Sequence, residues 1–156
     1  MRRIVRLAVI AAAIGGALAV AEPVQGQDGV AGTWVTEFPR RVVNGEGSDF
    51  AKARLTLEVK GDSVFGTYQV FEPAADPAPP ARRLKGTNVN GTLTLEGEPM
   101  EARVRMGGGD DSPVMMRQTY VLKVANGELT GTIEAASTDG TINARPRPFT
   151  AKRESA

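Results

Sequence analysis

The residue types that most often carry catalysis are missing from this chain. It contains no histidine and no cysteine, which excludes serine–histidine triads, imidazole bases, thiol nucleophiles and most zinc sites. The acidic pair Asp110-Asp111 lies in the glycine-rich stretch "GGGDDSP" and could bind Ca²⁺, but it lacks the spaced oxygen ligands of a calcium loop. We therefore interpret that stretch as a solvated turn and expect no catalytic residue, no metal and no cofactor.

Four side chains have the chemistry to hold a small molecule: Tyr68, Met116, Gln118 and Tyr120. Together they offer apolar surface, two phenols and one amide, a mixture that suits a small amphipathic ligand. The same four residues also fit the top of a filled hydrophobic core. The choice between these interpretations depends on the elements that position the four side chains.

Most of the chain after residue 29 alternates apolar and polar residues, as strands with one dry and one wet face do. "LTLEV" (55–59) and "YVLKV" (120–124) are examples. The pattern predicts a single all-β domain with about eight strands, the fifth of them kinked around Gly97–Pro99. The expected strands are 31–38, 54–60, 63–71, 82–89, 91–106, 115–125, 128–136 and 141–152. If "EGEP" (96–99) is instead a hairpin turn, the chain has nine strands.

Short and long connections alternate along the chain. Tight turns are expected near 60–63, 89–91 and 125–128, and longer connections at 39–52, 72–81, 107–113 and 137–140. In an antiparallel meander, every second connection lies at the same end. We therefore expect an up-and-down barrel with one neat end and one end crowned by loops, and a β-sandwich is the alternative. Arg40 and Arg41 begin the first long loop, where such a pair usually faces solvent.

Strand alternation also assigns the inward face of this barrel. The expected inward residues are Leu55, Leu57, Val59, Val64, Tyr68, Val70, Leu93, Leu95, Tyr120, Leu122, Val124, Leu129 and Ile133. At ~1.5–3 kcal/mol for each buried large side chain, this set is sufficient to organise a core. Gly66, Gly131, Ala135 and Ala144 share that face, where small residues either let strands bend or leave room for a ligand. Phe38 and Val70 are expected beside the four candidate residues at the loop-rich end.

The first 21 residues have the form of a secretory signal peptide. "MRRIVR" is basic, "LAVIAAAIGGALAV" is apolar or small, and Ala19-Val20-Ala21 is a small-x-small processing site. Cleavage there removes three arginines, so the 19 basic residues fall to 16 against 18 acidic ones, a net charge of −2. That charge gives no reason to expect nucleic acid as a partner. We expect a periplasmic or secreted protein without a stable membrane anchor, with a flexible linker at 22–29 and a barrel domain at 30–154.

The only tryptophan follows directly on Gly32-Thr33, at the start of the first expected strand. This Gly-x-Trp resembles the calycin superfamily, the lipocalin-like and avidin-like barrels, and "DSVFGTY" (62–68) is similar to the second hairpin of avidin-type barrels. The resemblance implies that Trp34 plugs the closed end and is covered by an arginine of the last strand, matched here by Arg153. Avidin-type biotin sites use several tryptophans, so biotin is not expected as a ligand.

These observations favour an exported, non-catalytic binding module that holds a small apolar or amphipathic ligand at the loop-rich mouth of a barrel. The alternative is a cell-envelope interaction or structural domain with a filled barrel, which would use outward residues such as Phe65 and Phe71. A cavity of roughly 300 Å³ or more would favour the binding module.

Overall fold

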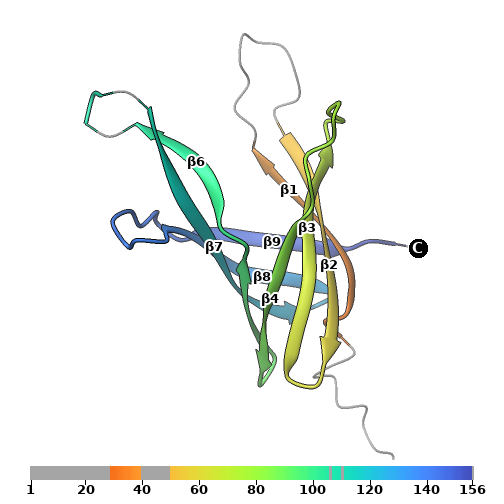
Figure 1. Ribbon diagram of the computed structural model, residues 1–156. Coiled ribbons are helices and arrows are strands. Elements are labelled where there is room, and N and C mark those ends of the chain that lie inside the picture. The colour runs from red at the N-terminus through yellow and green to blue at the C-terminus, as the bar shows by residue number, and fades with distance from the viewer. Residues whose placement is uncertain (1–28, 40–49, 106, 110, 156) are drawn as a thin grey trace, which may run out of the picture.

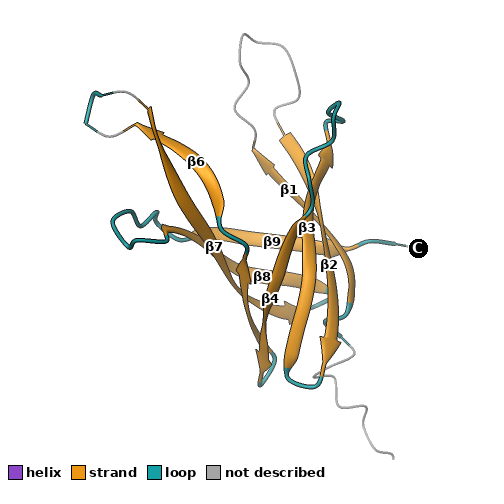
Figure 2. Ribbon diagram, in the orientation of Figure 1, coloured by secondary structure: helices purple, strands orange, loops and turns teal. Residues whose placement is uncertain are grey.

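A computed structural model of the chain describes residues 29–39, 50–105, 107–109 and 111–155. The expected signal peptide at 1–21 and residues 22–28 of the expected linker lie outside the described residues, as do Arg40, Arg41 and Asp110. The described residues form nine strands and no helix (Figure 2). The strands are β1 (Gly32–Pro39), β2 (Phe50–Lys60), β3 (Ser63–Glu72), β4 (Arg82–Val89), β5 (Thr92–Gly97), β6 (Met100–Arg105), β7 (Asp111–Ala125), β8 (Glu128–Ser137) and β9 (Arg147–Arg153).

The nine strands of the described residues form one antiparallel sheet in the order β5-β4-β3-β2-β1-β9-β8-β7-β6. An additional pairing of β5 with β7 closes this sheet on itself. Closure leaves eight strands in an up-and-down barrel and β6 as one extra strand (Figure 1). The predicted all-β barrel is therefore confirmed, and the sandwich alternative is wrong.

The region 91–106, predicted as one kinked strand, is divided into β5 and β6 at Glu98 and Pro99. The nine strands of the alternative are therefore confirmed. Both β5 and β6 pair antiparallel with β7, so they run in the same direction and residues 96–99 do not form the hairpin turn of that alternative. Proline has no amide hydrogen for a strand ladder, which explains the break. The amide of Glu98 instead donates a hydrogen bond to the Arg83 carbonyl at 3.1 Å.

β2 and β7 begin earlier than predicted, because each pairs with the preceding strand over more residues than expected. β2 begins at Phe50 rather than at residue 54, since Ala51 and Ala53 are buried and continue the ladder with β1. β7 begins at Asp111 rather than at residue 115, since its first residues pair with β6. Short polar or small residues had hidden both extensions in the sequence.

The last strand begins later than predicted, at Arg147 rather than at residue 141. Pro146 precedes it and cannot donate to a ladder. The segment before Pro146 makes an isolated bridge between Asn143 and Ala136 instead of a strand. Ala144, which was expected on the inward face, is exposed in this connection.

The tight turns lie together at one end of the barrel, as predicted. Asn90-Gly91 and Asn126-Gly127 both have positive φ angles (52° and 79°, 53° and 76°), the backbone of a two-residue type I′ hairpin turn. The β2–β3 turn lies at this same end, and the β3–β4 connection and the β6–β7 ribbon extend toward the opposite end (Figure 1). The opposite end is the mouth of the barrel.

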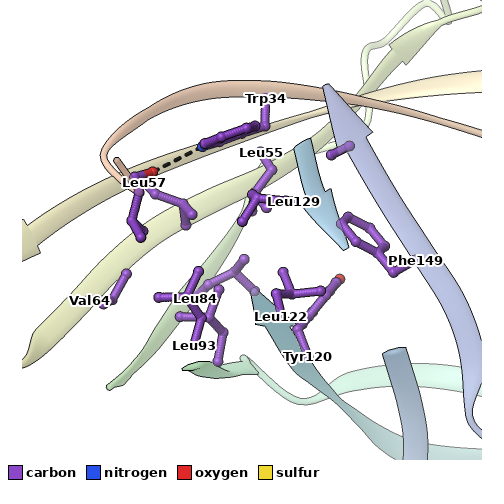
Figure 3. Close-up of a cluster of buried hydrophobic side chains, with 13 residues drawn as sticks. Trp34, Leu55, Leu57, Val64, Leu84, Leu93, Tyr120, Leu122, Leu129 and Phe149 are labelled. Atoms are coloured by element: carbon purple, nitrogen blue, oxygen red, sulfur yellow. Dashed lines mark hydrogen bonds between the residues drawn. The ribbon is translucent and has the colours of Figure 1, made fainter. Parts of the chain in front are cut away.

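The core fills the tight-turn half of the barrel (Figure 3). Of the predicted inward residues, the buried ones are Leu55, Leu57, Val64, Leu93, Leu95, Tyr120, Leu122 and Leu129. Val59, Tyr68, Val124 and Ile133 are partly buried and pack against this cluster, so the predicted inward face is confirmed for them as well. Leu84 and Phe149 also belong to the core, although alternation had not singled them out.

Inward glycines serve the close approach of neighbouring strands. A Cβ added at Gly131 would overlap the carbonyl oxygen of Val121, and one added at Gly66 would overlap the carbonyl oxygen of Thr56. These positions therefore have no space for any side chain. Small inward residues were expected either to let strands bend or to leave room for a ligand. Gly66 and Gly131 serve the first role, since neighbouring backbone occupies the space around them.

Candidate binding site at the barrel mouth

The closed end of the barrel is filled by Trp34, whose side chain is 0% exposed. Its indole N–H donates a hydrogen bond to the Val30 carbonyl at 3.0 Å (Figure 3). The Arg153 guanidinium lies 4.4 Å from the ring centroid, within the range of a cation–π contact. It also donates to the carbonyls of Ala31 and Gly29, at 2.9 and 2.6 Å. A ligand therefore has no room at this end of the barrel.

The mouth opens where β1 and β9 separate. The ladder between these strands consists of Trp34 opposite Arg153 and Val35 opposite Lys152. Thr36 Oγ1 makes the next link by donating to the Thr150 carbonyl at 2.7 Å. Beyond Thr36, both strands line an open cavity of about 610 Å³. The lining residues are Thr36, Glu37, Phe38, Pro39, Tyr68, Val70, Arg82, Gln118, Ile133, Arg147, Pro148, Phe149 and Thr150.

The structure brings three of the four candidate residues together. Tyr68 and Gln118 line the cavity. Tyr120 lies beneath them in the core, 1% exposed, and its hydroxyl donates to Gln118 Oε1 at 3.0 Å. Met116 does not line this cavity; it is half-buried on β7 opposite Met100, where the extra strand β6 pairs with β7.

A small polar network forms the floor of the cavity. Gln118 Oε1 accepts hydrogen bonds from the Tyr120 hydroxyl and from Arg82 Nη1, each at 3.0 Å. The Arg82 guanidinium also lies 5.8 Å from the centroid of the Tyr68 ring. The Tyr68 and Tyr120 rings are 6.2 Å apart, and Tyr120 meets Phe149 edge to face at 5.6 Å. Aromatic packing therefore fixes the positions of the polar groups.

Both phenols of the site are neutral at physiological pH. Burial raises the pKa of Tyr120 and of Tyr68 above the ordinary value of 10.0. The positive charge of Arg82 opposes this increase at both residues, and the charge of Arg147 opposes it at Tyr68. Tyr120 therefore donates its hydroxyl proton to Gln118, and the neutral Tyr68 hydroxyl is able to donate a hydrogen bond as well.

Two hollows adjoin the main cavity beneath the proline-rich connection 73–81. Their volumes are about 420 and 390 Å³, and both share Val70 with the main cavity. Gln69 Nε2 donates to the Pro79 carbonyl at 3.4 Å, which ties this connection to β3. The proline-rich connection therefore forms one wall of the mouth.

The candidate set missed the two arginines of the cavity, Arg82 and Arg147. Both were within reach of the alternation rule. Arg82 precedes the inward Leu84 by two residues, and Arg147 precedes the inward Phe149 by two residues. Arg147 lies within the predicted last strand and Arg82 begins the predicted strand 82–89, but neither was assigned to the inward face.

The described ranges hold no group of three or more Asp, Glu, His or Cys residues close enough to bind a metal ion. Within the same ranges, no helix is long and apolar enough to cross a membrane. In comparisons with known proteins, no family model, no curated protein and no solved structure matches this chain.

Proposed function

We propose that this chain is an exported, non-catalytic binding module that holds a small amphipathic ligand at the mouth of its barrel. The observation that carries the proposal is the open cavity of about 610 Å³, a size within the range of small-molecule sites, roughly 300–1,000 Å³. Export is inferred from the basic start, the apolar run and the small-x-small site of residues 1–21.

The composition of the cavity supports an amphipathic ligand. Phe38, Val70 and Ile133 contribute apolar surface, and Tyr68 and Gln118 contribute a phenol and an amide. A mostly apolar wall with a few converging polar groups is the usual form of a small-molecule site. The filled tight-turn half supports the same proposal, because it gives the mouth a rigid base.

Membership of the calycin superfamily is part of the proposal. It is supported by the closed up-and-down barrel and by the stacking of Arg153 on Trp34 at the start of β1. A barrel closed at one end and open at the other suits the capture of a small molecule without a chemical reaction.

The proposal is tested by titrating the chain without residues 1–21 with the neutral dye N-phenyl-1-naphthylamine and following its fluorescence. We expect saturable binding. Val70→Trp fills the point shared by the three hollows, so it should weaken binding about tenfold or more. Val121→Trp is the matched control, because Val121 is 43% exposed on the outer face of β7. Absence of saturable binding, or equal weakening by both variants, contradicts the proposal.

Two further variants test the polar floor. Gln118→Leu removes the acceptor shared by Arg82 and Tyr120, and Tyr120→Phe removes one donor while keeping the buried ring. Both should weaken uptake of an amphipathic ligand while the far-ultraviolet circular dichroism stays unchanged. Tyr120→Ala is unsuitable, because it would leave a cavity in the core.

The alternative proposal, an interaction domain that uses the outer face, rests on Phe65. This side chain is 45% exposed and lines an outer hollow of about 350 Å³. If Phe65→Ser abolishes dye binding and Val70→Trp does not, the outer face is the binding surface and the mouth is not.

A further inference from the structure

Two guanidinium groups line the cavity at the mouth, that of the half-buried Arg82 and that of the exposed Arg147. Arg82 is half-buried, donates to the amide oxygen of Gln118 and lies against the Tyr68 ring. Arg147 lines the same cavity from β9. The ion pairs found among the described residues use other basic side chains, namely Lys52, Arg54, Arg105, Arg117 and Lys152. Within the part of the chain that the structure describes, neither arginine of the cavity has a carboxylate partner.

Arg82 (β4) and Arg147 (β9) line the same cavity, from strands on opposite sides of the barrel. Both positive charges oppose the increase in the pKa of the Tyr68 phenol, which lines this cavity as well. Glu37 is the acidic residue of the cavity lining, and it occupies an outward position of β1, opposite Lys52 and between the inward Thr36 and Phe38. The lining of the main cavity therefore carries two positive charges and one negative charge, and Glu98 lines the adjoining hollow together with Arg82.

Arg82 is half-buried beside apolar walls, where a positive charge is less favourable unless an anion balances it, whereas Arg147 is exposed and adds its charge from the rim of the cavity. Guanidinium groups bind carboxylates and other oxyanions through strong, charge-assisted hydrogen bonds. Tyr68 lines the same cavity, and its neutral hydroxyl can donate one more hydrogen bond. Ile133, Phe149 and Val70 would then contact the apolar part of the ligand.

We propose that the mouth selects amphiphiles with a single anionic head group, held by Arg82 and Arg147, and an apolar tail packed against Ile133 and Phe149. This inference rests on the proposed function, since it names the class of ligand for the same cavity. It predicts that neutral and cationic amphiphiles with the same tail bind more weakly.

The test displaces bound N-phenyl-1-naphthylamine with four amphiphiles that share one tail: dodecanoate, dodecyl sulfate, dodecanol and dodecylammonium, all below the concentrations at which they aggregate. We expect both anions to compete about tenfold or more better than dodecanol, the size of effect that one or two charge-assisted hydrogen bonds produce. Dodecylammonium should be the weakest competitor. Equal competition by dodecanoate and dodecanol overturns the inference and leaves the proposed function intact, whereas absence of dye binding overturns the proposed function itself.

Neighbouring arginines supply matched variants. Arg82→Gln and Arg147→Gln should each reduce the preference for dodecanoate over dodecanol by about tenfold, measured as the ratio of the two competition constants in the same variant. Arg83→Gln removes the same charge from an outward position of β4 and should leave the preference unchanged. Arg82→Lys should retain part of the preference, which separates a charge effect from a disturbed fold. An equal loss in Arg83→Gln and Arg82→Gln would mean that overall charge, not the site, attracts anions, and the inference would be wrong.

Discussion

Replacing Trp34 by alanine should cost about 3–5 kcal/mol of unfolding free energy, the usual range for a fully buried large aromatic side chain. The side chain is 0% exposed. Burying roughly 150–250 Å² at about 25 cal/mol per Å² corresponds to roughly 4–6 kcal/mol, an upper bound because unfolded chains already bury part of that area. The variant also loses the hydrogen bond to Val30 and the contact with Arg153.

The position of Trp34 gives this substitution a second effect. Trp34 belongs to one of the two residue pairs that join β1 to β9. The void that Trp34→Ala leaves therefore lies directly beside the shortest ladder in the barrel. The β8–β9 ladder, in comparison, has six residue pairs. Loosening the β1–β9 ladder should favour local opening of the barrel before global unfolding.

The assay is urea unfolding followed by far-ultraviolet circular dichroism, since the variant has lost the only tryptophan. Phe65→Ala is the control, because this aromatic side chain is 45% exposed and should cost less than about 1 kcal/mol. A double-mutant cycle of Trp34→Phe and Arg153→Met should give a coupling of about 0.5–2 kcal/mol. A cost below about 1 kcal/mol for Trp34→Ala, or no coupling in the cycle, would refute the assignment of Trp34 as a structural plug.

Three further predictions concern the phenols, strand closure and export. Because burial raises the pKa of both tyrosines above 10.0, the folded protein should show less phenolate absorbance at that pH than the urea-unfolded chain, and equal absorbance would contradict this. The stability that the two tyrosines contribute should be complete below pH 10 and should fall as the pH rises further. Gly86→Ala should destabilise the barrel by about 1–3 kcal/mol because its Cβ would overlap the backbone of the neighbouring strand. Gly97→Ala should cost far less, since its Cβ would meet the Leu84 side chain at 3.4 Å, and equal costs would refute the argument. N-terminal sequencing of exported protein should find Glu22 first, and exported protein that begins at Met1 would show that the leader is retained.

Period-two alternation was sufficient to predict the barrel and most of its core. Leu55, Leu122 and Leu129 point inward because the strand pleat places every second residue on the same face. Asn-Gly pairs fixed two tight turns, since both residues adopt positive φ with little strain. Strand starts were harder to predict. Ala51 and Ala53 are buried, yet their small side chains gave no apolar signal.

The site was predicted only in part, because a cavity depends on side chains from strands that are distant in the sequence. Alternation correctly predicted Tyr68 and Gln118 at the mouth. It could not show that the Tyr120 ring lies below them and packs edge to face against Phe149. It also could not show that β6 is an extra strand outside the barrel, or that Met116 pairs with Met100 of this strand. β1 and β9 pair at only two residue positions and then separate, which opens the cavity. Nothing in the local sequence pattern indicates this separation.

Methyl NMR offers the most direct test of ligand binding at the mouth, since the chain after residue 21 contains two isoleucines, Ile133 and Ile142. Ile133 lines the cavity, and Ile142 lies in the β8–β9 connection outside it. Isoleucine δ1-methyl labelling therefore yields one signal from the site and one internal control. On titration with dodecanoate, we predict a saturable shift of the Ile133 signal and no shift of the Ile142 signal. An Ile133 signal that stays unchanged at saturating dodecanoate, or equal shifts of both signals, would contradict ligand binding at the mouth.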